Sequence, residues 1–130
     1  MQLLIDHNLT GEADLLAGAL LATGWLELLS IRLVTFDTVD LADNIDDRSL
    51  WRFVQAQQMI LLTENRNMKG KDSLEQTIRD ESTAESLPVI TISSRRRLEN
   101  RDYRQRCAER IVEIVIELER YRGASRIYIP

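Results

Sequence analysis

Short, almost wholly apolar runs alternate along this chain with stretches in which apolar residues recur every three or four positions. Apolar runs bounded by polar residues predict buried β-strands, and a spacing of three and four predicts helices with one apolar face. The runs predict strands at residues 2–6, 31–36, 59–63, 87–92 and 126–129. The spacing predicts helices from Thr10 to Gly24 and at 48–58, 73–82 and 98–122, and the last of these carries the longest apolar stripe.

This alternation predicts the fold class. Strands joined by helical crossovers form a parallel sheet that is covered on both faces. The run at 59–63 is apolar until Thr63, as expected of a strand buried on both sides. We therefore expect an α/β protein, specifically a three-layer α/β/α sandwich with a central, mainly parallel sheet. A length of 130 residues fits a single domain that spans residues 1–130.

The composition is that of a globular protein, with 44% hydrophobic and 29% charged residues. The longest apolar stretch, residues 15–22, is far shorter than the roughly 20 residues that cross a bilayer, and no secretory leader precedes the first strand. The single cysteine, Cys107, lies on an apolar stripe and is expected in the core. These features predict a cytoplasmic protein.

Charge is distributed unevenly along the chain. Residues 1–94 hold 7 basic and 15 acidic side chains, a net charge of −8, whereas residues 95–130 hold 10 basic and 6 acidic, a net charge of +4. Fifteen of the 17 basic residues are arginine, which suits bidentate contact with phosphate or carboxylate. Two interpretations stay open: a solvated helix face crossed by ion pairs, or a surface that contacts phosphate.

Polar side chains follow two of the predicted strands. Asp6 and Asn8 come at the end of the first strand, and Asn65 and Asn67 come after the strand that ends at Thr63. Ligands of open parallel sheets bind at the carboxyl ends of the strands, so we expect these side chains to form one polar site. Whether Asp47 reaches the same site depends on how the acidic loop at 37–47 folds, which spacing alone does not determine.

These motifs resemble those of PIN-like nucleases. The segment Leu-Leu-Ile-Asp-His-Asn-Leu at 3–9 resembles the opening strand of that family, with Asp6 at its first metal-binding carboxylate and Asn8 at its strand-end amide. Asp-Arg-Ser-Leu at 47–50 resembles its helix-opening acid. The segment 60–68 resembles its third motif, Thr-x-Asp-x-Asp-Phe, but here Asn65 and Asn67 replace the two aspartates and Met68 replaces the phenylalanine.

The resemblance implies a PIN-like Mg²⁺- or Mn²⁺-dependent endoribonuclease, a hydrolase that cleaves single-stranded RNA. It also implies a toxin-like protein, a homodimer and an antitoxin-like partner. Dimerisation would be further favoured if Trp25 or Trp51 does not fit inside the core. Asp6 and Asp47 would be catalytic and bind the metal, with Asn65 and Asp72 as further ligands. Asn8, Thr63 and Asn67 would contact the substrate, and arginines would guide the RNA backbone, namely Arg95, Arg96, Arg97, Arg101 and Arg104.

Structural interpretations stand beside each of these roles. Asp6 also suits a solvated strand end, Asp47 suits a helix N-cap, and Asn65 and Asn67 suit a turn. Two amides in place of two carboxylates weaken the expected metal affinity, so the alternative function is a catalytically degenerate PIN-like domain that binds RNA or another protein. With His7 as the one histidine and no nucleophile motif, zinc sites and serine triads are disfavoured.

Overall fold

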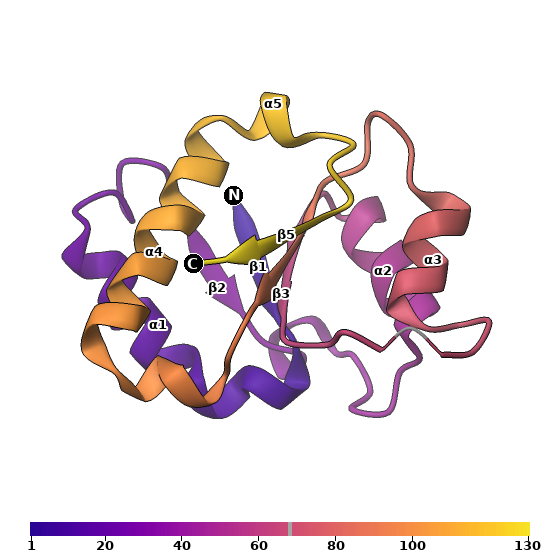
Figure 1. The fold of residues 1–130 in the computed structure, drawn as a ribbon, viewed down its shortest axis with the longest axis horizontal. Helices are drawn as coiled ribbons and strands as arrows, with labels where there is room; N and C mark the ends of the chain where they lie inside the picture. Colours follow the sequence, from indigo (N-terminus) through magenta and orange to yellow (C-terminus); the bar gives the residue numbers. More distant parts are fainter. Residues whose placement is uncertain (68) are drawn as a thin grey trace.

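The computed structural model describes residues 1–67 and 69–130. These residues form a central sheet with helices packed on it (Figure 1). The strands are β1 (Gln2–Ile5), β2 (Arg32–Val34), β3 (Ile60–Thr63), β4 (Val89–Ile92) and β5 (Arg126–Ile129). The α-helices are α1 (Ala13–Ala22), α2 (Asp47–Ala56), α3 (Leu74–Glu81), α4 (Arg101–Ile116) and α5 (Leu118–Tyr121). Short 3₁₀ helices lie at His7–Glu12, Asp37–Val39 and Arg96–Glu99.

All five strands of the sheet run parallel in the order β2-β1-β3-β4-β5. Helices α1 and α4 cover one face and α2 and α3 cover the other (Figure 1). The predicted three-layer α/β/α sandwich is therefore confirmed. No helix among residues 1–67 and 69–130 is long and apolar enough to cross a bilayer.

The strands alternate their side chains between two cores. Leu3, Ile5, Ile60 and Leu62 belong to the core under α1 and α4, whereas Leu4 and Leu61 pack with α2 and α3. Side chains of successive strand residues point to opposite faces, so a strand buried on both faces must be apolar throughout. This requirement explains the unbroken apolar runs in the sequence.

The strand order places the topological switch point of the sheet between β1 and β3. The chain leaves β1 through α1 to reach β2 on one side, and it enters β3 on the other side of β1 after crossing the opposite face through α2. Loops at the carboxyl ends of these two strands therefore diverge, which is where parallel sheets bind ligands. Asp6 follows β1 and Thr63 ends β3, so the fold brings their positions together.

The first predicted helix begins later than expected. Residues His7–Glu12 form a 3₁₀ helix, and the Thr10 hydroxyl donates to the His7 carbonyl at 2.8 Å instead of capping α1. The buried stripe of α1 runs through Leu16, Ala19 and Leu20, and this leaves Leu21 60% exposed. Gly24, predicted as the terminator, follows the helix with a left-handed φ of +80°.

The long helix predicted at 98–122 is broken at two points. Asn100 adopts an extended backbone, and its side chain accepts the Tyr103 N–H at 2.9 Å, so α4 begins only at Arg101. A second interruption at Glu117, with φ −106° and ψ 32°, separates α4 from α5. The apolar stripe continues across both breaks, with Leu98 buried and Leu118 half-buried, so periodicity alone does not reveal them.

Candidate functional site

The carboxyl ends of β1 and β3 bring Asp6 and Thr63 into direct contact. The Asp6 N–H donates to the Leu62 carbonyl at 2.9 Å, which extends the strand pairing to the site. The Thr63 hydroxyl, fully buried, donates to Asp6 Oδ2 at 2.5 Å. Asp6 itself is only 8% exposed, so it is a buried, hydrogen-bonded acid and not a solvated strand end.

Asp47 reaches the same region from the start of α2. Asp46 occupies the N-cap position of that helix, so the interpretation of Asp47 as its cap is wrong. The Asp47 carboxylate instead accepts the N–H of Leu74, the first residue of the neighbouring helix α3, at 3.0 Å. It also accepts from Asn65 Nδ2, at 3.0 Å to Oδ1 and 3.1 Å to Oδ2.

A continuous chain of hydrogen bonds joins the two acids. Asn65 donates its backbone N–H to Thr63 Oγ1 at 2.9 Å and its amide to Asp47, while Thr63 donates to Asp6. Burial, together with the negative charge of Asp47, raises the pKa of Asp6; the Thr63 hydroxyl and the backbone N–H groups of His7 and Asn8 oppose that shift. The fold therefore brings Asp6 and Asp47 within electrostatic range of each other.

The two asparagines that replace acids shape the loop after β3. Asn65 Oδ1 accepts the Asn67 N–H at 2.8 Å, and Asn67 Oδ1 accepts the Lys69 N–H at 3.1 Å. Both are side-chain turns of the kind that asparagine favours, so their interpretation as turn residues is confirmed. The first turn also orients Asn65, because its oxygen faces the loop and its NH₂ group therefore faces Asp47.

Asp72 lies on the rim of the site and is held by an arginine. An open hollow of about 440 Å³ is lined in part by Asp47, Asn67, Asp72 and the two lysines of the chain, Lys69 and Lys71. Asp72 Oδ1 accepts from Arg48 Nε at 3.0 Å. Arg48 also contacts Asp80 and Glu81 of α3, so this ion-pair cluster ties the loop to both helices. Met68 lies outside the described residues.

The arginines predicted to guide RNA occupy different environments. Arg95 forms ion pairs with Glu12 at 2.9 Å and Glu64 at 3.7 Å. The guanidinium of Arg97 stacks over the Tyr103 ring at 4.5 Å, and Arg96 is exposed.

The remaining candidates lie farther out on the surface. Arg104 donates to the carbonyls of Leu98 and Glu99, and Arg101 is exposed at the start of α4. Asn8 is exposed beside Asp6, and His7 Nδ1 lies 3.3 Å from Asp43 Oδ1.

One residue that the sequence did not single out is Arg126, at the start of β5. Its side chain is 5% exposed and donates through Nη1 to the Asn65 carbonyl at 2.7 Å and to Thr91 Oγ1 at 2.8 Å. Nη2 lies 3.6 Å from Glu75, and within the described residues Nε and Nη2 have no hydrogen-bond partner. The only available signal was a charged residue opening a short, otherwise apolar strand. Arg126 therefore holds the loop that contains Asn65 through its hydrogen bond to the Asn65 carbonyl.

The site offers two carboxylates, those of Asp6 and Asp47, as oxygen ligands. Oxygen ligands are those that Mg²⁺ and Mn²⁺ prefer, and a cation would relieve the repulsion between Asp47 and the buried Asp6. In the part of the chain that the structure describes, no three acidic, histidine or cysteine side chains gather as a metal site. The Asn65 amide, with its N–H groups directed at Asp47, provides no third acid.

Comparisons with other proteins add no identification. Neither the protein-family models, nor the curated proteins, nor the solved structures searched include a match to this chain.

Proposed function

We propose that this protein is a PIN-like ribonuclease that depends on Mg²⁺ or Mn²⁺ and cleaves single-stranded RNA. The observation that supports the proposal is the hydrogen-bond chain through Thr63 and Asn65 that links Asp6 to Asp47, two acids far apart in the sequence, at the carboxyl ends of β1 and β3. A buried acid near a second acid is energetically unfavourable, so the position of Asp6 close to Asp47 favours a functional role. Functional sites commonly carry such a stability cost.

Each residue of the site would have a distinct role. Asp6 and Asp47 would hold the cation, and Thr63 would keep Asp6 oriented through its 2.5 Å hydrogen bond. A bound Mg²⁺ or Mn²⁺ supplies charge neutralisation at the phosphate and lowers the pKa of a water molecule. Arg126 would keep the Asn65 loop in place by binding its carbonyl group. Exposed Arg96 and the two lysines of the hollow would contact the RNA backbone.

The proposed location is the cytoplasm. Burial raises the pKa of the Cys107 thiol to about 11, so this single cysteine stays protonated and unreactive at neutral pH. A chain whose one cysteine is buried suits a reducing compartment.

An RNA-cleavage assay tests the proposal. Purified protein incubated with a labelled single-stranded RNA and Mn²⁺ should produce fragments, and Asp6→Asn and Asp47→Asn should each abolish them. Asp40→Asn is the matched control, because Asp40 is exposed and its left-handed φ of +58° is tolerated by asparagine. Cleavage that persists in Asp6→Asn, or that never appears with either metal, would contradict the proposal.

A second candidate is a metal-free PIN-like domain that binds RNA or a protein without cleaving. The observation that favours it is the Asn65 amide, which donates to both oxygens of Asp47 and so stabilises that carboxylate without a cation. Calorimetric titration with Mn²⁺ separates the two candidates. Binding by the wild-type protein supports the nuclease, whereas binding only after Asn65→Asp supports the metal-free domain.

A further inference from the structure

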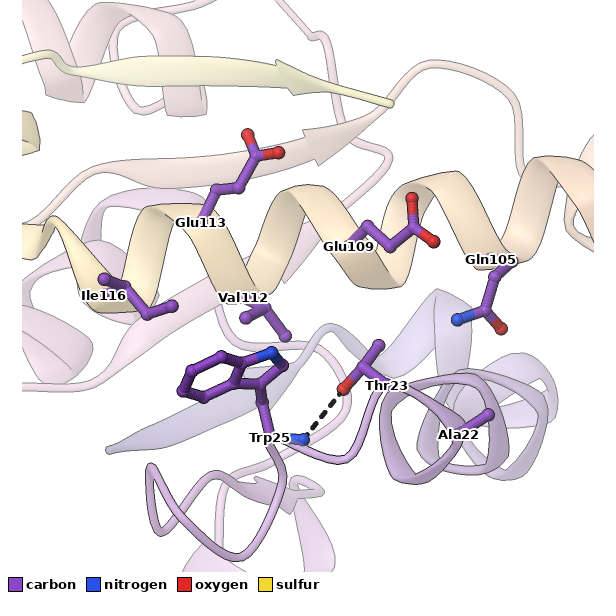
Figure 2. Close-up of a pocket in the computed structure, with 8 residues that line it drawn as sticks. All are labelled: Ala22, Thr23, Trp25, Gln105, Glu109, Val112, Glu113 and Ile116. Carbon is purple, nitrogen blue, oxygen red and sulfur yellow. Dashed lines mark hydrogen bonds between the residues drawn. The ribbon is translucent and has the colours of Figure 1, made fainter.

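Two of the described tryptophan, tyrosine and phenylalanine side chains are exposed, Trp25 and Tyr128, and their surroundings carry opposite charge. Trp25 lies in a hollow of about 500 Å³ between α1 and α4, and the charged residues that line this hollow are Glu109 and Glu113 (Figure 2). Carboxylates repel a phosphodiester backbone, so this hollow is unsuited to nucleic acid.

Tyr128 instead lies among arginines. It is 50% exposed on β5, an edge strand of the sheet. The guanidinium of Arg66 lies 5.7 Å from the centroid of its ring, and that of Arg126 lies 5.9 Å from it. Glu75 lies 3.6 Å from Arg126, so the two arginines and this one acid have a net charge of +1. An exposed aromatic ring beside surplus positive charge is the arrangement with which proteins bind single-stranded nucleic acid.

Tyr128 lies in line with the candidate site along one row of the sheet. Thr63 pairs with Thr91, and Thr91 pairs with Tyr128. Asp6 continues the row on the other side of Thr63, because β1 and β3 pair in this register up to the residue before each. Neighbouring strands lie about 4.8 Å apart, so the row spans about 14 Å from Asp6 to Tyr128.

This row is on the side of the sheet that α2 and α3 cover. Leu4, Leu61 and Val89, each two residues earlier on β1, β3 and β4, belong to the core under these helices, and side chains two residues apart share a face. Thr91 is fully buried there, whereas Tyr128 at the edge of the sheet is half exposed. The row therefore leads from the acids to open surface.

The loop after β3 connects the two ends of this row. Asn65 of this loop donates to Asp47. Arg66, the next residue, places its guanidinium beside the Tyr128 ring. Arg126 lies against the same ring and donates to the Asn65 carbonyl at 2.7 Å, so it holds the loop and the ring together. One short loop therefore relates the position of the ring to that of the acids.

We propose that Tyr128 and Arg66 form a subsite for one nucleotide of the single-stranded RNA, next to the position of cleavage. The base stacks on the exposed part of the Tyr128 ring, and the Arg66 guanidinium contacts the phosphate. Stacking accepts every base, so the subsite binds without sequence preference. The subsite rests on the proposed function in one respect, that RNA is the ligand of the site. The structural alternative is a tyrosine that only shields the edge of β5.

RNA binding by proteins that do not cleave tests the subsite. Every protein carries Asp6→Asn, which the proposed mechanism makes inactive, and the anisotropy of a labelled oligoadenylate of about ten nucleotides gives the dissociation constant. Tyr128→Leu should raise this constant about tenfold or more because base stacking is lost, whereas Tyr128→Phe keeps the ring and should change it less than about twofold. Tyr121→Leu is the matched control and should leave binding unchanged. Tyr121 also lies beside an arginine, Arg110 at 5.4 Å, but it packs on the core under α1 and α4.

Salt dependence separates stacking from charge. Arg66→Gln should weaken binding and reduce the slope of the logarithm of affinity against the logarithm of salt concentration by about 0.7, the share of one phosphate contact on a single strand. Tyr128→Leu should weaken binding with the slope unchanged, because stacking releases no counterions. A Tyr128→Leu protein that binds within about twofold of its parent, or an Arg66→Gln protein with an unchanged slope, overturns the subsite.

The outcome for the subsite is separate from the outcome for the ribonuclease. If the wild-type protein leaves RNA intact but Tyr128→Leu weakens binding, the ribonuclease is wrong and the subsite stands. If the wild-type protein cleaves RNA but Tyr128→Leu binds as its parent does, the ribonuclease stands and the subsite is wrong. Oligoadenylate that does not bind at about 100 µM protein also overturns the subsite.

Discussion

Replacing Thr63 by valine removes the hydroxyl at the centre of the site and changes little else. Valine has the same shape and keeps the β-branched side chain that a buried strand favours. Thr63 is fully buried and Asp6 is only 8% exposed, so water is poorly placed to replace the hydroxyl as a partner of the Asp6 carboxylate. The Asp6 carboxylate loses a donor at 2.5 Å, and the Asn65 N–H loses an acceptor at 2.9 Å.

The size of the effect follows from these two contacts. A hydrogen bond to a charged group contributes about 1.5–3 kcal/mol, and a neutral one contributes about 1 kcal/mol. Their sum predicts that Thr63→Val lowers the free energy of unfolding by about 3 kcal/mol. For a chain of this size that loss corresponds to a melting temperature about 10 °C lower.

Urea denaturation at pH 7, followed by tryptophan fluorescence, to which the buried Trp51 contributes, measures this loss. Thr77→Val is the matched control, because Thr77 is equally buried but donates to a neutral group, the Ser73 carbonyl, at 2.8 Å. The control should lose about 1 kcal/mol. A Thr63→Val loss no larger than that of the control would refute the charged hydrogen bond to Asp6.

Three further changes probe the same region. Burial and the charge of Asp47 raise the pKa of Asp6 in the folded protein, so the stability contributed by Asp6 is greatest below the ordinary pKa of aspartate and is lost as pH rises through the raised pKa. Asp6→Asn should therefore have a higher melting temperature than the wild type at pH 7 and the same melting temperature at pH 3. A lower melting temperature of Asp6→Asn at pH 7 would contradict this. Asn65→Asp replaces the amide that donates to Asp47 with a third carboxylate, so it should destabilise the metal-free protein and tighten Mn²⁺ binding. Thermal melts in EDTA measure the first effect, and melts in Mn²⁺ measure the second. Equal melting temperatures of the variant in EDTA and in Mn²⁺ would contradict the prediction. Arg48→Met removes the ion pairs with Asp72, Asp80 and Glu81, so it should lower the free energy of unfolding more at low salt than at high salt. A loss of stability that is the same at both salt concentrations would show that these charges do not act together.

Part of the site could be predicted because it depends only on sheet geometry. The carboxyl ends of parallel strands lie at one edge and side chains alternate between faces, so polar residues that follow β1 and β3 are expected at the same edge, and the pairing of these two strands brings them together. Asp6 and Thr63 meet in this way. The turn-forming role of Asn65 and Asn67 was equally local, because each bonds the backbone two residues on.

Other parts depend on contacts that no local pattern encodes. Asp47 joins the site because the segment before α2 crosses the carboxyl edge of the sheet and because Leu74, far along the chain, donates to it. Arg126 reaches Asn65 by extending its long side chain past Thr91, which a strand pattern does not show. The breaks at Asn100 and Glu117 were missed because the apolar stripe continues through them.

The most direct test of the proposed nuclease site is the anomalous difference map of a crystal soaked in Mn²⁺. If Asp6 and Asp47 bind a common cation, one strong peak lies within about 2.3 Å of a carboxylate oxygen from each residue. No peak between these carboxylates, or a peak bound by Asp72 without Asp6, would contradict the shared metal site.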